Sequence, residues 1–409
     1  MEVDNRNISR PRVLFINSKT LLPNIDGATI RSTQMLRMLS ETCDVDVVYT
    51  CSKSTKPADV SPLYKYCGKV TEFTTSALAM VARGLSGLFT RKPLQCSYFY
   101  SREAQRYIDE HIAEYDFVFC NNLRAAQYVI GKKCNKVIDF VDALSMRYKH
   151  DAENAGTLWR MLYSLESHRL ERYETSILKE FQGCFVISDV DRKYMLSNAQ
   201  GVEKSIYVVN NSTEIKQCVK QNSEYNLVFV GSMFYDPNIV AVTSFVHNVL
   251  PKVLNEHPQT KFYIVGTRPA AQVRHLQSDN VIVTGFVDDP LQYLLKATIV
   301  VVPMISGAGV QNKILEAMSM GCCVVTTPIG AEGLDNIVNG KDIVIADGRE
   351  ELAEQINSLI DDVNRRSNIG AEARKYIENN LTYQIIAKQF KSYLDLILQE
   401  MKNSNSSGR

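Results

Sequence analysis

Short apolar runs alternate along the chain with longer stretches of helical periodicity, in two successive series. The apolar runs are continuous, which is typical of parallel strands covered by helices on both faces. This alternation predicts β-α-β units and an α/β fold. The predicted strands are Val13–Ile16, Val45–Tyr49, Phe117–Phe119, Lys136–Val141, Cys184–Ile187 and Ile206–Val209 in the first series, and Asn226–Val230, Lys261–Val265, Val281–Val283, Thr298–Val302 and Cys322–Val325 in the second.

A polar stretch, Asn210–Ser223, separates the two series and indicates a domain boundary. We therefore expect an N-terminal domain over residues 1–211 and a C-terminal domain over residues 212–381. The amphipathic segment 382–402 is expected to form a final helix that packs back on the first domain. A chain of 409 residues with 45% hydrophobic content is long and apolar enough for two cores.

Composition narrows the class of protein. Lysine plus arginine (46) nearly balances aspartate plus glutamate (45), which does not favour nucleic-acid binding through bulk charge. The ten cysteines include no C-x-x-C pair and lie mostly in apolar runs, as in a reducing compartment. Met1–Arg12 lacks the apolar centre of a signal peptide, and no uncharged run approaches the ~20 residues that span a bilayer. We expect a cytoplasmic protein.

The most informative segment is Val302–Gly321, a predicted strand, a loop of small residues and then a helix. Gly307, Ala308 and Gly309 would let the backbone approach a ligand closely. The free N–H groups at the start of the following helix would face the same point with partial positive charge. Ligands of open α/β sheets bind at the carboxyl ends of strands, so the segment predicts a site for a diphosphate.

Lys313 and Glu316 lie on one polar arc of that helix, together with Asn312, whereas the opposite arc is apolar. Two interpretations fit this pattern. The first is a pair of ligand contacts beside the glycine loop. The second is an ordinary surface pair at i and i+3, which stabilises a helix by only ~0.2 to 0.5 kcal/mol.

Three motifs in this half of the chain resemble glycosyltransferase family 4, the retaining nucleotide-sugar transferases of the GT-B fold. Val230–Asn238 resembles the G-S-M-x-x-x-P-N opening of the donor domain, Val283–Asp289 the segment whose backbone holds the base, and Leu315–Gly321 the nucleotide-ribose motif. The likeness covers Leu227–Gly333 and is weaker over the first domain. It implies two Rossmann-like domains facing across a cleft.

The resemblance also implies an activity. Such an enzyme moves a sugar from a nucleotide-diphosphate donor to a hydroxyl acceptor with retention, in polysaccharide or glycolipid assembly. Glu316 would accept hydrogen bonds from ribose hydroxyls, and the loop Gly307–Val310 would contact the diphosphate. The expected donor-binding residues are Gly231, Ser232, Arg268, Phe286, Val287, Gly307, Ala308, Gly309, Val310, Lys313 and Glu316.

The chain departs from the family pattern at two places. Ala308 stands where the family's first glutamate is common, and Ser232 and Pro237–Asn238 replace a frequent arginine and lysine pair. Charge neutralisation must then come from elsewhere, and Lys313 is the nearest candidate. Arg268 is a second candidate, with a solvated loop arginine as the alternative.

In the first domain, the loop after the opening strand resembles the family's loop that faces donor phosphate and acceptor. Asp26, Gly27 and Arg31 are its expected acceptor-side contacts, and a turn followed by an exposed helix arginine is the alternative. Asp139 and Asp142 form a carboxylate cluster that could orient an acceptor hydroxyl or cap a helix. The expected catalytic residues are Lys313, Asp142 and Arg31. Cys120–Asn122 occupies the place where family members often carry a histidine, so no histidine base is expected.

Ala77–Lys92 mixes apolar and basic residues and could form an interfacial helix on anionic lipid, or an ordinary core helix. This is the basis for expecting peripheral contact at the inner membrane face. No metal-ligand cluster is visible, and we expect no cofactor. The expected partners are a nucleotide sugar and a glycan, glycolipid or other hydroxyl acceptor, without nucleic acid.

Two other functions stay open. A nucleotide-sugar epimerase of the same fold would need no separate acceptor, and a non-catalytic sugar- or partner-binding module would explain the missing first glutamate at Ala308. A dinucleotide oxidoreductase is disfavoured because Asn312 stands where the third glycine of its fingerprint belongs.

Overall fold

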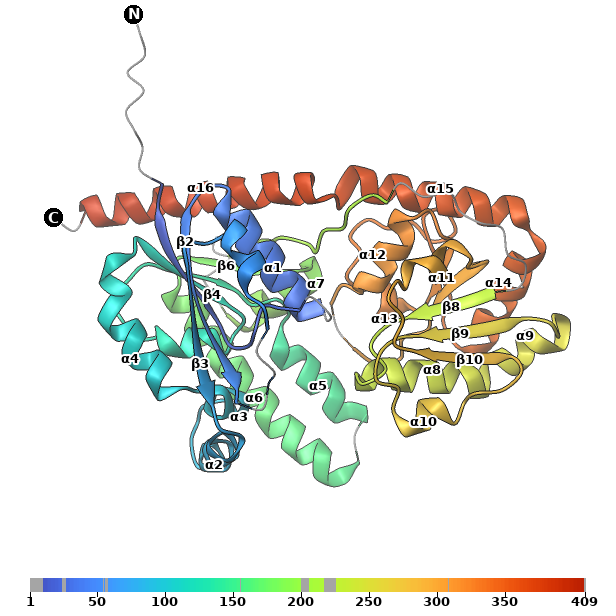
Figure 1. The fold of residues 1–409 in the computed structure, drawn as a ribbon, viewed down its shortest axis with the longest axis horizontal. Helices are drawn as coiled ribbons and strands as arrows, with labels where there is room; N and C mark the ends of the chain where they lie inside the picture. Colours follow the sequence, from blue (N-terminus) through green and yellow to red (C-terminus); the bar gives the residue numbers. More distant parts are fainter. Residues whose placement is uncertain are drawn as a thin grey trace, which may run out of the picture. The chain divides into compact units, whose positions relative to one another are not determined.

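The computed structural model describes residues 10–23, 27–53, 55, 58–154, 156–199, 206–216, 226–307 and 309–407. The chain divides into two compact units. The first comprises Met1–Val186, Asp191–Val209 and Ala387–Arg409, and the second Ile187–Val190 and Asn210–Ile386. Each unit is built around its own sheet with helices packed against it (Figure 1).

The first unit contains a parallel seven-stranded sheet in the order β3-β2-β1-β4-β5-β6-β7. Its strands are β1 (Arg12–Asn17), β2 (Asp44–Ser52), β3 (Lys69–Thr75), β4 (Phe117–Asn121), β5 (Lys136–Asp139), β6 (Gly183–Val186) and β7 (Ile206–Val208). Its helices are α1 (Gly27–Ser40), α2 (Ala77–Gly87), α3 (Leu94–Phe99), α4 (Arg102–His111), α5 (Leu144–Asn154), α6 (Thr157–Glu180) and α7 (Asp189–Asn198), with short 3₁₀ turns at Ser61–Lys65, Ile112–Glu114 and Ala125–Tyr128.

Aromatic residues fill the centre of this unit. Phe15 of β1 stacks on Phe119 of β4 with ring centroids 5.6 Å apart, and both side chains are fully buried. The last helix, α16 (Tyr383–Ser407), contributes side chains to the same core. The ring centroids of Phe390 and Phe185 lie 5.1 Å apart. Gly183 makes room for α16, since an added Cβ there would lie 2.4 Å from Ile397.

The second unit contains a parallel six-stranded sheet in the order β10-β9-β8-β11-β12-β13. Its strands are β8 (Asn226–Val230), β9 (Lys261–Val265), β10 (Val281–Gly285), β11 (Ile299–Val302), β12 (Val324–Thr326) and β13 (Val344–Ile345). Its helices are α8 (Asp236–Asn248), α9 (Leu250–Glu256), α10 (Ala271–Arg274), α11 (Leu291–Leu295), α12 (Asn312–Ser319), α13 (Pro328–Ala331), α14 (Arg349–Asp361) and α15 (Val363–Asn380).

The structure confirms the predicted strands of both series, with ends shifted by a few residues, and adds two at sheet edges. β3 was missed because Lys69–Thr75 is an edge strand that is nowhere fully buried, and its sequence lacks a continuous apolar run. β13 has only two residues.

In both sheets the first strand lies in the interior. The next two strands are added on one side of it, and the later strands are added on its other side. The reversal lies between β1 and β4 in the first unit and between β8 and β11 in the second. Ligands of such sheets bind beyond the carboxyl ends of the strands at this reversal. The search for a site therefore begins there in each unit.

Candidate functional site

In the second unit, β8 and β11 are neighbours and run in parallel. The chain leaves β8 at Gly231, and it leaves β11 through the loop that leads to α12. Gly307 and Gly309 adopt φ values of 116° and 72°, which favour glycine over residues with a side chain. Ala308 lies outside the described residues. The conformation of this loop therefore favours glycine at both of these positions.

Lys313, in the first turn of α12, connects the loop to the β8–α8 segment. Its Nζ donates to Oδ1 of Asn238 at 3.0 Å and to Oε1 of Gln311 at 2.9 Å. The ammonium also lies 5.4 Å from the centroid of the Phe229 ring. Burial lowers the pKa of Lys313 to about 8, and the nearby Glu316 charge opposes this shift only in part. The site thus holds a cation whose charge is poorly solvated.

Glu316 follows one turn later and is half-buried. Burial raises the pKa of its carboxyl, while Lys216 and Lys313 lower it. The partners of the Lys313 ammonium within the described residues are amide oxygens and the Met304 sulfur, and they do not include the Glu316 carboxylate. The interpretation of Lys313 and Glu316 as an ordinary surface ion pair does not describe this arrangement.

Asn238 was part of a quoted motif but received no role of its own, and Gln311 was missed. The Nδ2 of Asn238 donates to the carbonyl oxygen of Ser232 at 3.0 Å, so its amide joins the turn after β8 to Lys313. The helix α8 begins at Asp236 with Tyr235 as its cap residue. One sequence signal pointed to this role of Asn238, namely its position next to Pro237 at the start of a helix.

The other expected donor contacts follow the neighbouring strands of the sheet. Gly266, after β9, packs so tightly that an added Cβ would lie 1.7 Å from the carbonyl oxygen of Gly231. Arg268 is exposed and adopts φ 51°. Phe286 is 72% exposed after β10, and Val287 beside it is half-buried. The structure therefore brings Gly231, Ser232 and Lys313 together at the reversal. It places Arg268, Phe286 and Val287 beyond the carboxyl ends of the neighbouring strands β9 and β10.

In the first unit, Arg31 of α1 forms a bidentate ion pair with Asp139 at the end of β5. Its Nε donates to Oδ2 at 2.9 Å and its Nη2 to Oδ1 at 3.1 Å, and both side chains are fully buried. The expectation that Arg31 and Asp139 contact phosphate or acceptor directly is corrected here, because each uses its charge on the other and neither reaches the surface. The pair fixes α1 against β5.

Asp142 remains an accessible carboxylate beyond the carboxyl end of β5. Its Oδ2 lies 3.5 Å from Nη1 of Arg147, and its side chain is 20% exposed. The residue before it, Val141, has φ 74°, which is an uncommon and strained conformation for a β-branched residue. Gly27 is the exposed first residue of α1, and Asp26 lies outside the described residues.

An asparagine cluster at the reversal of the first sheet was not predicted. Asn17, at the end of β1, accepts hydrogen bonds from Asn121 at 3.1 Å and Asn122 at 3.0 Å. Asn121 also donates to Ser32 at 2.6 Å, while its own Oδ1 is buried and has no hydrogen-bond partner among the described residues. The sequence signal that could have revealed this cluster is an asparagine at the end of each of the two strands β1 and β4. The sequence argument had used Asn121 and Asn122 only to note the absence of a histidine.

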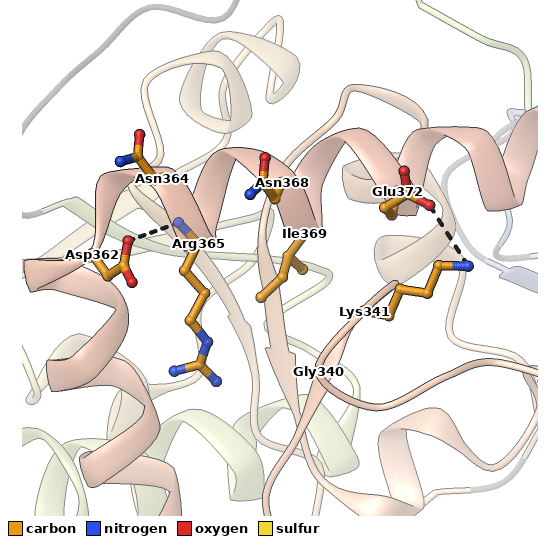
Figure 2. A pocket seen from close by; sticks show the side chains of 8 residues that line it. All are labelled: Gly340, Lys341, Asp362, Asn364, Arg365, Asn368, Ile369 and Glu372. Atoms are coloured by element: carbon orange, nitrogen blue, oxygen red, sulfur yellow. Dashed lines mark hydrogen bonds and ion pairs between the residues drawn. The ribbon is translucent and has the colours of Figure 1, made fainter.

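A shallow hollow of about 510 Å³ lies elsewhere in the second unit, between the Gly340 turn and α15 (Figure 2). Its charged groups are already engaged: Lys341 lies 3.7 Å from Glu372, and the Arg365 guanidinium donates to Ser358 and Gln355. We do not assign it as the site, because its charged side chains already have partners within the protein. Within the described residues there is no group of three or more side chains suited to a metal ion.

Comparison with known proteins finds similarity to glycosyltransferases. Residues 224–362 match the family model described as glycosyl transferases group 1. The chain is 24% identical over 394 residues, 90% of its length and 96% of the relative's, to an uncharacterized 44.6 kDa protein in the cps region of Klebsiella pneumoniae. It is 26% identical over 200 residues to the capsular polysaccharide biosynthesis glycosyltransferase CapM of Staphylococcus aureus, covering 47% of this chain and 51% of CapM.

Solved structures share the fold over nearly the whole chain. Sucrose-phosphate synthase from Thermosynechococcus elongatus superposes with a TM-score of 0.69 at 14% identity, covering 96% of this chain and 100% of that one. Anabaena HepE in complex with UDP-glucose superposes with a TM-score of 0.66 at 16% identity, covering 94% and 99%. The fold is GT-B, and the family match supports a glycosyltransferase.

Proposed function

We propose that this protein transfers a sugar with retention from a nucleoside-diphosphate donor to a hydroxyl acceptor, and that the donor binds at the β8–β11 reversal. The observation that carries the proposal is the Lys313 ammonium, poorly solvated and bound to two amide oxygens. A poorly solvated charge that no carboxylate contacts directly is costly, and a bound diphosphate would place negative charge against it.

The chemistry follows from where the charge develops. As the glycosidic bond breaks, negative charge grows on the departing diphosphate, and a preorganised cation and backbone N–H groups stabilise it. Lys313 is the proposed cation, and the Gly307–Val310 loop provides the N–H groups. Glu316 would accept hydrogen bonds from the ribose hydroxyls. We propose that Gly231 and Ser232 contact the donor beside Lys313. Arg268, Phe286 and Val287 are proposed to contact its nucleotide farther from the reversal.

Asp142 is the proposed acceptor-side carboxylate, since it is the accessible member of the Asp139–Asp142 cluster. Arg31 becomes a positioning residue that acts through Asp139. The proposed acceptor class is a growing surface polysaccharide or glycolipid, because CapM is named for capsular polysaccharide biosynthesis and the Klebsiella relative is named for its cps region. No metal or cofactor takes part in this proposal.

The test is a comparison of Lys313→Ala with Glu316→Gln in steady-state transfer. Lys313→Ala should lower kcat by about a hundredfold or more, since it removes charge stabilisation that grows toward the transition state. Glu316→Gln should chiefly raise the donor KM and reduce the preference for a ribose donor over its 2′-deoxy analogue. Lys252→Ala is the matched control, because Lys252 is an exposed lysine of the same unit paired with Glu350.

Near-normal kinetics of both site variants would contradict the proposal. Incubation with donor alone tests for an epimerase, which would yield an isomerised sugar. The absence of hydrolysis with donor alone, together with the absence of transfer when acceptor is added, would indicate a binding module. The anomeric configuration of the product, read by proton NMR, decides between retention and inversion.

A further inference from the structure

The first unit carries a concentration of exposed apolar side chains on α2, on the turn after it and on the first half of α6. We call this surface the α2–α6 patch. It holds half of all the large hydrophobic side chains exposed in the described residues, and Phe89 and Leu78 are 93% and 85% exposed. Its members are Leu78, Val81, Leu85, Leu88, Phe89, Leu158, Trp159, Met161 and Leu165.

The helix α2 is not an ordinary core helix. Of its residues, only Met80 and Gly87 are buried, whereas its leucines and Val81 point away from the core. The interpretation of Ala77–Lys92 as a core helix is therefore wrong. A concentration of exposed apolar side chains of this kind indicates a binding surface.

The apolar residues of α2 and α6 belong to one surface. Leu158, Met161 and Leu165 follow the i, i+3, i+7 spacing of a single helix face. Arg169, one turn further along α6, donates from Nη2 to the carbonyl oxygen of Leu88 at 2.9 Å. The α6 stripe therefore runs directly toward the end of α2, and Figure 1 shows α2, α3 and α6 at the same end of the first unit.

The two sequence intervals that carry the patch hold charge of one sign. No aspartate or glutamate occurs between Glu72 and Glu103, whereas this interval contains Arg83, Arg91, Lys92 and Arg102. The first half of α6, from Thr157 to Leu165, likewise contains Arg160 and no acidic residue. Arg91, Lys92 and Arg160 are exposed.

We propose that the α2–α6 patch docks the protein onto an anionic lipid bilayer. Its apolar side chains would enter the boundary between headgroups and acyl chains, and the basic residues would contact lipid phosphates. Trp159, the only tryptophan of the chain, is 57% exposed within the patch, and an amphipathic indole suits the membrane interface. A second copy of the chain is a poorer occupant, since a symmetric dimer would bring the same basic residues together.

This docking is independent of the donor chemistry, so its test needs no transferase activity. The full-length protein is mixed with vesicles of phosphatidylcholine alone or of an equal mixture of phosphatidylcholine and phosphatidylglycerol. Binding is followed by flotation and by tryptophan emission, which reports on Trp159 alone. We expect flotation and a blue shift with the anionic vesicles, both weakened by salt.

Two variants separate the apolar and charged contributions. Leu78→Ser with Phe89→Ser should reduce the partition coefficient by about tenfold or more, because each side chain loses its burial in lipid. Arg91→Gln with Lys92→Gln should abolish the preference for anionic over neutral vesicles. Leu396→Ser, an exposed leucine of α16, is the matched control and should bind like the wild type.

Circular dichroism and thermal melts confirm that each variant folds. Absence of flotation and an unchanged Trp159 spectrum would overturn the proposal. So would equal binding to neutral vesicles that ignores the basic residues, or self-association in sedimentation experiments that shields Trp159 without lipid.

Discussion

The Nζ of Lys313 donates a hydrogen bond of 3.0 Å to Oδ1 of Asn238, and the same amide donates from Nδ2 to the Ser232 carbonyl oxygen. Asn238 therefore links the turn after β8 to the cation of α12. Its Oδ1 orients the ammonium without neutralising it, and this leaves the charge available to a ligand.

Asn238→Ala should lower kcat by about ten- to a hundredfold, because Lys313 is then held less accurately. Asn238→Asp should instead raise the donor KM, because the new carboxylate pairs with Lys313 and competes with the diphosphate. Steady-state kinetics with varied donor measures both effects. Asn248→Ala in the same helix serves as control, since the hydrogen bonds of the Asn248 amide within the described part of the chain stay inside α8. Equal kinetics of the two alanine variants would remove Asn238 from the site.

Lys313→Met should stabilise the unliganded protein at pH 7 while it lowers kcat, as Lys313→Ala should. The pKa of Lys313 is about 8 in the folded protein against an ordinary value of 10.5 for lysine, so its charged form destabilises the fold below pH 8. Removing the charge should add about 1–3 kcal/mol to the free energy of unfolding. The advantage should shrink as the pH rises from 8 to 10.5, where the native lysine loses its proton before the unfolded one does. Urea melts across this range test the sign, and a variant less stable than wild type at pH 7 would contradict it.

Glu174→Gln should reveal a second buried charge, in the first unit. Glu174 accepts hydrogen bonds from the backbone and hydroxyl of Ser145, and burial raises its pKa to about 7 from 4.5. The wild type should therefore lose about 2–4 kcal/mol relative to the variant as the pH rises from 4.5 to 7, because the folded state must then ionise a buried acid. Thermal or urea unfolding measures the difference. Glu110→Gln, an exposed position of α4, should show no such trend.

The Arg31–Asp139 pair predicts strong coupling in a double-mutant cycle. Arg31→Met or Asp139→Leu alone leaves a fully buried charge without its partner and should cost about 3–5 kcal/mol. The double variant should cost clearly less than the sum of the two, since no charge is then stranded. Additive losses would show that the two side chains act independently.

Transfer should survive treatment with EDTA, because the proposal assigns charge neutralisation to Lys313 and to backbone N–H groups. The assay is run before and after chelation and dialysis, with added magnesium or manganese as the comparison. A loss of activity that either ion restores would transfer this role to a metal.

Local sequence patterns were sufficient for the elements of the fold and for one side of the site. Continuous apolar runs revealed the buried strands, and the edge strand β3 escaped because exposure had removed that signal. Gly307, Gly309, Lys313 and Glu316 lie within ten residues of one another, so loop flexibility and helical periodicity were enough to bring them to notice.

Contacts between distant residues were decided only by tertiary structure. Arg31 and Asp139 are 108 positions apart, and Lys313 and Asn238 are 75 apart, so no local period relates them. From sequence alone, Arg31 and Lys313 could both be exposed side chains, and only the structure shows which residues they contact. The α2 helix shows the same limit for apolar residues, because the hydrophobic effect has no direction. Its leucines have the same pattern whether they face a core or water, and only the packing of the first unit determines that they are exposed.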